Sequence, residues 1–344
     1  MKEASEMRGE REALLALFFA SLKSAVTEER MEGALPEGAL EALFSLAQGQ
    51  ELTHAVGYGL QRSGLLPTTS SVEKDFRKRE MLALYSVERL LYETGRVKEL
   101  FEQEKIPFLP LKGAVVRSFY PEAFLRCGRD VDILVKREDC DRAAALLTER
   151  LGYTAGADRT FYDHKFTSPG GVNLELHFAL MDSDLFPKAE AFLNGIWERV
   201  TPIQGKQFQM EMGQEDFLLF HLLHMAKHFV LGGCGVRPFL DLFLLEQKMT
   251  LDKEAFSRLL EETGMIAFYD RCMLLTRVWF SGGAHTQDTL EMERYLFSGG
   301  LFGTEKTEAT ADAARGGGKK GTLLRSLVLC GLPCMAVVGK SRAY

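Results

Sequence analysis

The sequence lacks the features that mark membrane, secreted and disulfide-bonded proteins. No uninterrupted apolar run reaches the roughly 20 residues that span a bilayer, and the last apolar stretch, residues 327–339, is interrupted by Gly331 and Pro333. The charged N-terminus lacks the basic start, apolar centre and cleavage site of a signal peptide. None of the six cysteines forms a C-x-x-C pair, which disfavours a disulfide framework and a structural zinc site. We therefore expect a cytoplasmic protein without a membrane span.

A net positive charge is also lacking. The 344 residues carry a formal net charge of −6, whereas proteins that bind nucleic acid through many phosphate contacts usually present a basic patch. The sequence therefore predicts no extended nucleic-acid surface. With 46% hydrophobic and 26% charged residues, the composition is otherwise that of a globular protein.

Helical periodicity dominates both ends of the chain. Apolar residues recur at helical spacing through residues 11–100 and again after Asp216, with a β-rich stretch between them. This pattern favours an α+β core flanked by N-terminal and C-terminal helical regions. The expected divisions are an N-terminal helical region, a core, a C-terminal helical domain, and a flexible Gly-rich segment with its tail, at residues 1–100, 101–210, 211–303 and 304–344.

The β-rich stretch has a definite order of elements. Residues 107–111 resemble a brief strand, followed by a helix that begins at Gly113. Residues 131–135 form a β-branched strand, and the helix after it runs from 137 to 151 and ends at Gly152. Two further runs, 161–167 and 172–178, flank the sequence Ser-Pro-Gly-Gly and predict a β-hairpin.

Two aspartates alternate with apolar residues on the strand near residue 131. Side chains on a strand point to alternate faces, so Asp130 and Asp132 share one face while Val131, Ile133 and Val135 share the other. Adjacent carboxylates repel one another and raise each other's pKa unless a cation lies between them. A divalent ion with oxygen ligands, Mg²⁺ or Mn²⁺, removes this repulsion. Such a D-x-D pair also occurs on solvated edges and in structural Ca²⁺ sites.

The second strand of the hairpin has the same alternation. Val172, Leu174, Leu176 and Phe178 predict a buried face, which leaves Asn173, Glu175 and His177 on the other. If the two strands are sheet neighbours, Glu175 joins the two aspartates. Three carboxylates can hold two metal ions, which stabilise the attacking and leaving oxygens of a phosphoryl displacement. The alternative is that this polar face is simply hydrated.

Residues before the aspartates offer a phosphate site. Gly113 follows a strand and begins a helix, where a missing side chain lets backbone N–H groups approach a phosphate, although most turn glycines serve only the turn. Lys112 adds a positive charge. Arg126 and Arg129 precede the aspartates and can bind phosphate oxygens in a bidentate manner, or can form ion pairs with the acidic residues.

Three segments together resemble a known family. Residues 111–114 (LKGA), 125–135 (LRCGRDVDILV) and 174–177 (LELH) are similar to the uncharacterised nucleotidyltransferase family of the DNA polymerase β-like nucleotidyltransferase superfamily. The likeness extends from about residue 40 to residue 305. It includes, less specifically, Tyr120-Pro121 and the segments HMAKH, RPFLD and GGLFG, at residues 224–228, 237–241 and 299–303.

The resemblance implies a mixed β-sheet, Mg²⁺ dependence and transfer of a nucleotidyl group from an NTP. It places Gly113 at the triphosphate and Asp130, Asp132 and Glu175 at the metal. The superfamily usually has Gly-Ser or Gly-Gly where this chain has Gly113-Ala114. The tail after about Thr304 also departs from the Pro- and aromatic-rich helices that end the family's chains.

A helix rich in histidine follows the core. His221, His224 and His228 share one face at i, i+3 and i+7, with Lys227 beside them. Such a face can line a cleft, lie in a core or hold Zn²⁺, but the H-E-x-x-H motif of metalloproteases is absent. Downstream, the spacing of Arg237 and Asp241 suggests an i,i+4 ion pair.

We therefore expect a metal-dependent nucleotidyltransferase that moves a nucleoside monophosphate from an NTP to an unidentified hydroxyl acceptor, such as a sugar, another small molecule or a protein. The predicted catalytic and metal-binding residues are Asp130, Asp132 and Glu175, and the predicted nucleotide-binding residues are Lys112, Gly113, Arg126 and Arg129. Acceptor-side candidates are His177, His224, Lys227 and His228. The alternatives are a nucleotide-binding or regulatory module on the same fold, favoured by Gly113-Ala114 and the tail, and a metallohydrolase centred on the histidine helix.

Overall fold

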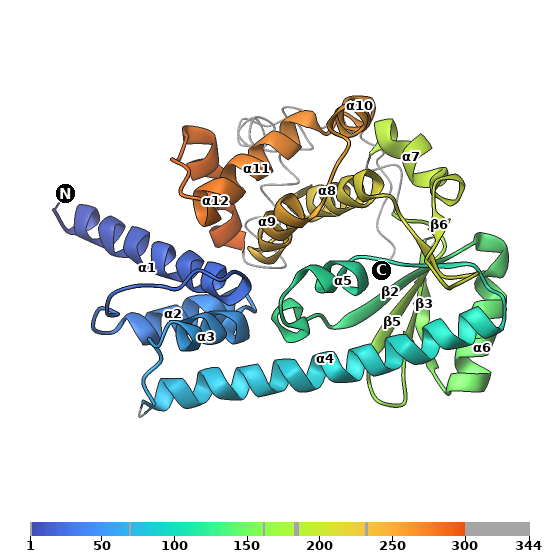
Figure 1. The fold of residues 1–344 in the computed structure, drawn as a ribbon, viewed down its shortest axis with the longest axis horizontal. Coiled ribbons are helices and arrows are strands. Elements are labelled where there is room, and N and C mark those ends of the chain that lie inside the picture. Colours follow the sequence, from blue (N-terminus) through green and yellow to red (C-terminus); the bar gives the residue numbers. More distant parts are fainter. Residues whose placement is uncertain (1, 69, 161, 182–185, 231–232, 300–344) are drawn as a thin grey trace.

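The structure is a computed structural model that describes residues 2–68, 70–160, 162–181, 186–230 and 233–299 (Figure 1). The expected Gly-rich segment and tail, residues 304–344, lie outside the described residues. No helix in the described part of the chain is both long and apolar enough to cross a bilayer.

A mixed five-stranded sheet forms the centre of the fold, as predicted. Its strand order is β1-β2-β5-β4-β3, in which β2 and β5 are parallel and the other neighbours are antiparallel. The bounds are β1 Phe108–Pro110, β2 Asp130–Val135, β3 Thr154–Arg159, β4 Asp163–Thr167 and β5 Asn173–His177. The predicted hairpin is the β4–β5 pair. Strand β3 was not predicted, because its sequence, TAGADR, is rich in residues of low strand propensity.

The N-terminal helices lead into the sheet. They are α1 Lys2–Val26, α2 Ala39–Gly49, α3 Thr53–Arg62 and α4 Ser71–Gln103. Helix α4 begins where the Ser70 hydroxyl accepts a hydrogen bond from the Glu73 N–H, a standard N-cap. It then runs from the N-terminal helices to the sheet (Figure 1). Helices α1 and α3 pack so closely that a Cβ on Gly59 would lie 1.9 Å from the Ser21 carbonyl oxygen.

Short elements connect the strands. Helix α5, Gly113–Val116, continues into the 3-10 helix η1, Arg117–Phe119, and η2, Ala123–Arg126, precedes β2. Helix α6, Cys140–Leu151, follows the 3-10 helix η3, Arg137–Asp139, and ends as predicted at Gly152, whose φ is 71°. After β5 come η5 Pro187–Ala189, α7 Glu190–Asn194, η6 Ile196–Glu198 and the small ribbon of β6 Thr201–Pro202 and β7 Met210–Glu211.

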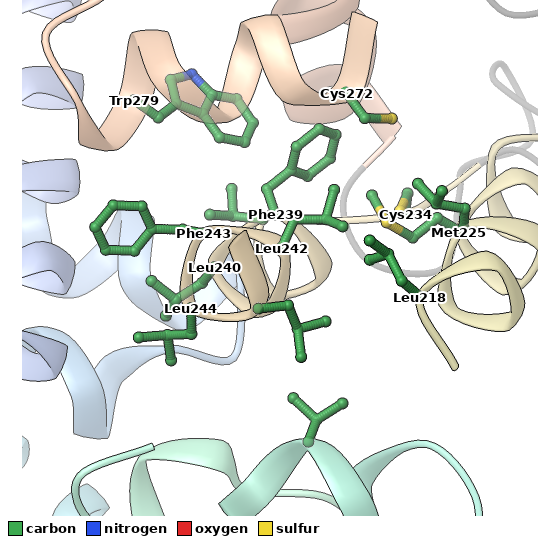
Figure 2. Packing of buried hydrophobic residues seen from close by; sticks show 14 of the residues in the cluster. Leu218, Met225, Cys234, Phe239, Leu240, Leu242, Phe243, Leu244, Cys272 and Trp279 are labelled. Atoms are coloured by element: carbon green, nitrogen blue, oxygen red, sulfur yellow. The ribbon is translucent and has the colours of Figure 1, made fainter. Parts of the chain in front are cut away.

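Five helices form the C-terminal part: α8 Gln214–Val230, α9 Arg237–Lys248, α10 Lys253–Thr263, α11 Ile266–Phe280 and α12 Gln287–Gly299. Helix α9 lies between α8 and α11 and buries side chains on all sides (Figure 2). Phe239 packs edge-to-face against Trp279 of α11, with ring centroids 4.9 Å apart. These helices share one hydrophobic cluster with α1–α3, so segments far apart in the sequence form a common core.

The two faces of the sheet have different environments. Val131, Ile133 and Val135 of β2, with Leu174 and Leu176 of β5, belong to a separate buried cluster that includes α4 and α6. The apolar alternation predicted from sequence is therefore confirmed on both strands. The opposite face of the sheet carries the acidic residues. There the polar side chains line a cavity together with residues of α5 and the C-terminal helices, and they do not pack into the core.

Candidate active site

Asp132 and Glu175 are direct neighbours across the parallel pair β2 and β5. The register also places Asp130 opposite Asn173. The expectation that the two strands are adjacent is thus confirmed, and it follows from strand alternation that Asp130, Asp132 and Glu175 project from the same face. Asp132 is buried, with 4% of its surface exposed, whereas Asp130 stands at the exposed start of β2.

A histidine completes the acidic cluster. The ligand atoms of Asp132, Glu175 and His177 lie within 4.8 Å of one another, the single such convergence among the described residues. The His177 Nε2 lies 2.9 Å from Asp132 Oδ1 and 3.5 Å from Glu175 Oε2. Because both neighbours are acceptors, this nitrogen carries a proton and donates to them. His177, predicted on the acceptor side, therefore lies against the carboxylates.

Lys112 supplies the positive charge that the buried carboxylates require. Its Nζ lies 2.6 Å from Asp132 Oδ1 and 4.0 Å from Glu175 Oε2. The Lys112 backbone has φ 45° and ψ −117°, a conformation that side-chain-bearing residues rarely adopt. Such strain costs about 1–3 kcal/mol and clusters at functional sites. The predicted phosphate-binding lysine thus lies against the acidic residues.

Opposing charges set the ionisation of the cluster. Burial raises the pKa of Asp132, but the Lys112 ammonium and the His177 hydrogen bond outweigh it, and the pKa falls well below its usual range. Burial lowers the pKa of His177, yet its hydrogen bonds to Asp132 and Glu175 raise it overall. The His177 hydrogen bond also lowers the pKa of Glu175. Desolvation, followed by repulsion from Asp132, raises the pKa of Asp130.

The donor set fits a hard divalent cation. Carboxylate oxygens are the ligands that Mg²⁺ and Mn²⁺ prefer, and His177 can add a nitrogen ligand only after Nε2 loses the proton that it donates to the carboxylates. The Lys112 ammonium already lies where a cation would neutralise Asp132, which shows that this position attracts positive charge. Asp132, Glu175 and His177 are therefore the residues that could hold a metal, with Asp130 at the edge of the cluster.

Gly113 is open to the cavity. Its φ is not positive, and a Cβ placed on it would meet only the Arg117 Nη2, at an ordinary 3.6 Å. Neither backbone conformation nor packing within the described residues therefore requires glycine at this position. The missing side chain instead leaves space for a ligand beside Lys112 and Asp132.

The two predicted phosphate-binding arginines are both engaged in ion pairs. Arg126 Nε donates to Asp241 Oδ1 at 2.7 Å, and the Tyr120 hydroxyl donates to the same oxygen at 2.7 Å. Arg129 pairs with Glu51. The expected i,i+4 pair of Arg237 with Asp241 is wrong. Asp241 is fully buried on α9, where Arg126 of η2 reaches it, and Arg237 turns to Glu51 at 3.3 Å.

The histidine helix lines the cavity, in agreement with one of the sequence interpretations. His221, His224 and His228 of α8 all face it, and the His224 and His228 rings meet edge-to-face at 4.6 Å. Burial lowers the pKa of all three, that of His228 to about 4, so these imidazoles are neutral at pH 7. The Lys227 ammonium lies 5.0 Å from the Tyr162 ring centroid, a cation–π contact. Across the described ranges, the α8 histidines belong to no convergent ligand set.

One cavity of about 380 Å³ is lined by every residue predicted from the sequence for catalysis, nucleotide binding and the acceptor side. The charged side chains in its lining and its placement at one face of a mixed sheet suit a charged ligand. The sequence profile of a protein family described as "Uncharacterised nucleotidyltransferase" matches residues 36–281. The chain belongs to this family. No curated protein and no solved structure matches the chain.

Some residues of the site could not be identified from the sequence. Glu51, which holds Arg129 and Arg237, lies in the turn between α2 and α3. Asp241, which holds Arg126, was expected to pair within its own helix. Glu51 lies 78 positions from Arg129 and 186 from Arg237, and Asp241 lies 115 from Arg126. Glu51 has a positive φ of 52°, which is rare for a glutamate, but this conformation cannot be recognised from the sequence.

Proposed function

We propose that this protein is a metal-dependent nucleotidyltransferase that transfers a nucleoside monophosphate from an NTP to a hydroxyl acceptor. The observation that carries this proposal is the pairing of Asp132 with Glu175 on adjacent strands, beside Asp130 and His177 in one cavity. Membership of a nucleotidyltransferase family supports the reaction class.

The carboxylates of Asp132 and Glu175, with Asp130 and His177, would hold Mg²⁺ or Mn²⁺. Such an ion, when bound, neutralises phosphate oxygens and stabilises charge that develops during phosphoryl transfer. Gly113 gives the triphosphate room to approach the backbone, since no side chain intrudes there. Lys112, whose side chain is long and flexible, would exchange its Asp132 contact for the phosphates of a bound NTP.

The α8 residues would face both substrates within this cavity. The neutral imidazoles of His224 and His228 can accept a hydrogen bond from an acceptor hydroxyl, because burial keeps them unprotonated. Lys227 can bind an anionic part of either substrate. Asp130 is exposed to the cavity, and its raised pKa makes it the better proton acceptor among the carboxylates.

The test is incubation with each of four α-labelled NTPs and Mg²⁺ or Mn²⁺, followed by measurement of pyrophosphate and of labelled products. Wild-type protein should release pyrophosphate, and Asp132→Asn should reduce release to background because it removes the charge but keeps the shape. Asp139→Asn, just after β2 and outside the cavity, is the matched control and should retain activity. Full activity of Asp132→Asn would contradict the proposal.

A second candidate is a nucleotide-binding module without turnover. It is favoured by the 2.6 Å contact through which Lys112 neutralises Asp132, and by Ala114 where the superfamily usually has serine or glycine. Calorimetry with each NTP and Mg²⁺ separates the two candidates. Binding without pyrophosphate release for any NTP and acceptor would favour the module.

A further inference from the structure

A second cavity, of about 400 Å³, adjoins the first. The two share Glu51, Gly128, Arg129 and Arg237 in their walls. The second cavity lies among the α2–α3 turn, α4, the loop between η2 and β2, and the start of α9. It therefore opens beside the start of β2, where Asp130 stands.

The second cavity has an excess of positive charge. Its described lining contains the guanidinium groups of Arg79, Arg129 and Arg237 and the carboxylate of Glu51, so three positive charges face one negative charge. His54, also in the lining, is buried, and its pKa is lowered to about 4, so it adds no charge at pH 7. Glu51 compensates Arg129 and Arg237, while Arg79 forms no ion pair with any described residue.

The wall between the cavities is held in place by an unusual backbone. Glu51 has a φ of 52°, in the left-handed region that glutamate seldom adopts. Its carboxylate pairs with Arg129 in the loop before β2 and with Arg237 at the start of α9, although neither is near it in sequence. The two guanidinium groups are thereby fixed at the boundary of both cavities, where one ligand in each cavity can meet them.

The two cavities are similar in volume, and each has room for about one ligand. The first, at about 380 Å³, is near the lower end of the roughly 300–1,000 Å³ typical of ligand pockets. A cavity near this lower limit suits one bound ligand, which leaves the second substrate to enter from the adjoining space.

We propose that the second cavity is the acceptor site and that it takes a small hydroxyl compound carrying a phosphate or carboxylate group, bound by Arg79 with Arg129 and Arg237. This inference rests on the proposed function. In the reaction, the acceptor hydroxyl oxygen bonds to the α-phosphorus of the NTP as the bond from that phosphorus to the pyrophosphate oxygen breaks. The hydroxyl proton passes to a cavity carboxylate and then to water, and the products are the nucleotidylated acceptor and pyrophosphate.

Three ligands with the same ring test the charge requirement: glucose, glucuronate and glucose 6-phosphate. Each is titrated calorimetrically into the full-length protein, alone and with a saturating non-hydrolysable NTP analogue and Mg²⁺. The two anions should bind in both conditions and glucose should not. Comparison of the two anions shows which group the arginines prefer. Failure of both anions to bind would overturn the proposal. Loss of their binding when the analogue is present would also overturn it, because competition with the analogue would place the anions in the first cavity.

Arg79→Gln should weaken binding of the anions by about tenfold, equivalent to ~1.4 kcal/mol. Arg79 is an exposed residue of α4, so its replacement should not disturb folding. Lys78→Gln, one position away and outside both cavities, is the matched control and should bind as wild type does. Equal affinity of Arg79→Gln and wild type would contradict the assignment.

Asp132→Asn distinguishes this proposal from the proposed function. That variant should still bind the anions, because Asp132 does not line the second cavity, but it should not transfer nucleotide. If the wild type releases pyrophosphate with other acceptors, but Arg79→Gln binds the anions as tightly as the wild type does, the acceptor site is elsewhere. If anions bind through Arg79 but no NTP is ever consumed, the reaction itself is wrong and the acceptor assignment falls with it.

Discussion

Asp132 and Glu175 face each other across two parallel strands that are joined by neither turn nor hairpin. Their adjacency requires the intervening chain that contains β3 and β4, because parallel neighbours cannot be joined by a tight turn. The fold therefore brings two carboxylates together from positions 43 residues apart, and it buries Asp132 beside a lysine and a histidine that satisfy its charge. An arrangement of this kind costs desolvation energy, which favours a role in binding charge over a role in stability.

Replacement of Gly113 by alanine should separate ligand binding from folding. The new methyl group would meet only the Arg117 Nη2, at an ordinary contact distance of 3.6 Å, so the free energy of unfolding should change by less than about 1 kcal/mol. The affinity for an NTP analogue should fall about tenfold, ~1.4 kcal/mol, as measured by calorimetry. Gly59→Ala is the contrasting control: its Cβ would collide with the Ser21 carbonyl, so it should destabilise the fold by about 1–3 kcal/mol or more. Unchanged nucleotide affinity in Gly113→Ala would remove this glycine from the binding site.

His177→Asn should weaken Mn²⁺ binding. His177 donates to both carboxylates of the cluster, and loss of a group that orients or adds to metal ligands typically costs 10–100-fold in affinity. Titration calorimetry with Mn²⁺ alone measures the effect without reference to activity. His164→Asn on the neighbouring strand β4 lies outside the cavity and should bind Mn²⁺ as wild type does. Equal affinities in the two variants would show that His177 has no part in metal binding.

The Asp241–Arg126 pair should be a major stabilising contact. Asp241 is fully buried, and it accepts hydrogen bonds from Arg126 and Tyr120. Asp241→Asn would leave the Arg126 charge without a buried partner, at a cost of about 3–5 kcal/mol. Urea denaturation followed by circular dichroism measures this loss. Asp288→Asn, which breaks an exposed pair with Arg271, should cost less than about 1 kcal/mol, and similar losses in both variants would contradict the account.

Stability should fall with acid between about pH 6.5 and pH 4, in part because of His54. Burial first, and then the Arg237 charge, lowers the pKa of His54 from 6.5 to about 4 in the folded protein. In that window the unfolded chain binds a proton that the folded protein does not, so the free energy of unfolding decreases as the pH falls. The contribution of this residue is on the order of 3 kcal/mol. Denaturation at a series of pH values should give a shallower slope for His54→Asn, and an identical slope would contradict the assignment.

The sequence predicted the parts of the site that depend on local patterns. Alternation of apolar and acidic residues around Asp132 and Glu175 defined both faces of two strands before any contact was known. Helical spacing placed His224 and His228 on one face in the same way. These patterns are reliable because a side chain's direction follows from the backbone period alone.

Long-range pairing could not be read from the sequence. Nothing local to Arg126 or Arg129 reveals that Asp241 and Glu51 will meet them, because such pairs depend on how distant helices pack. The same limit explains the mistaken pairing of Arg237 with Asp241, which is sound for an isolated helix but not for a helix buried on all sides. Strand β3 was missed because tertiary pairing with β4 overrides its weak strand propensity.

The most direct test of the central claim is to locate the metal. A crystal of the protein grown with Mn²⁺ and a non-hydrolysable NTP analogue would show the ion in an anomalous difference map. The account predicts a peak between β2 and β5, about 2.1 Å from carboxylate oxygens of Asp132 and Glu175, with Lys112 moved away from Asp132. A peak on the α8 histidines instead, or a bound nucleotide with Lys112 still on Asp132 and no ion beside it, would contradict the account.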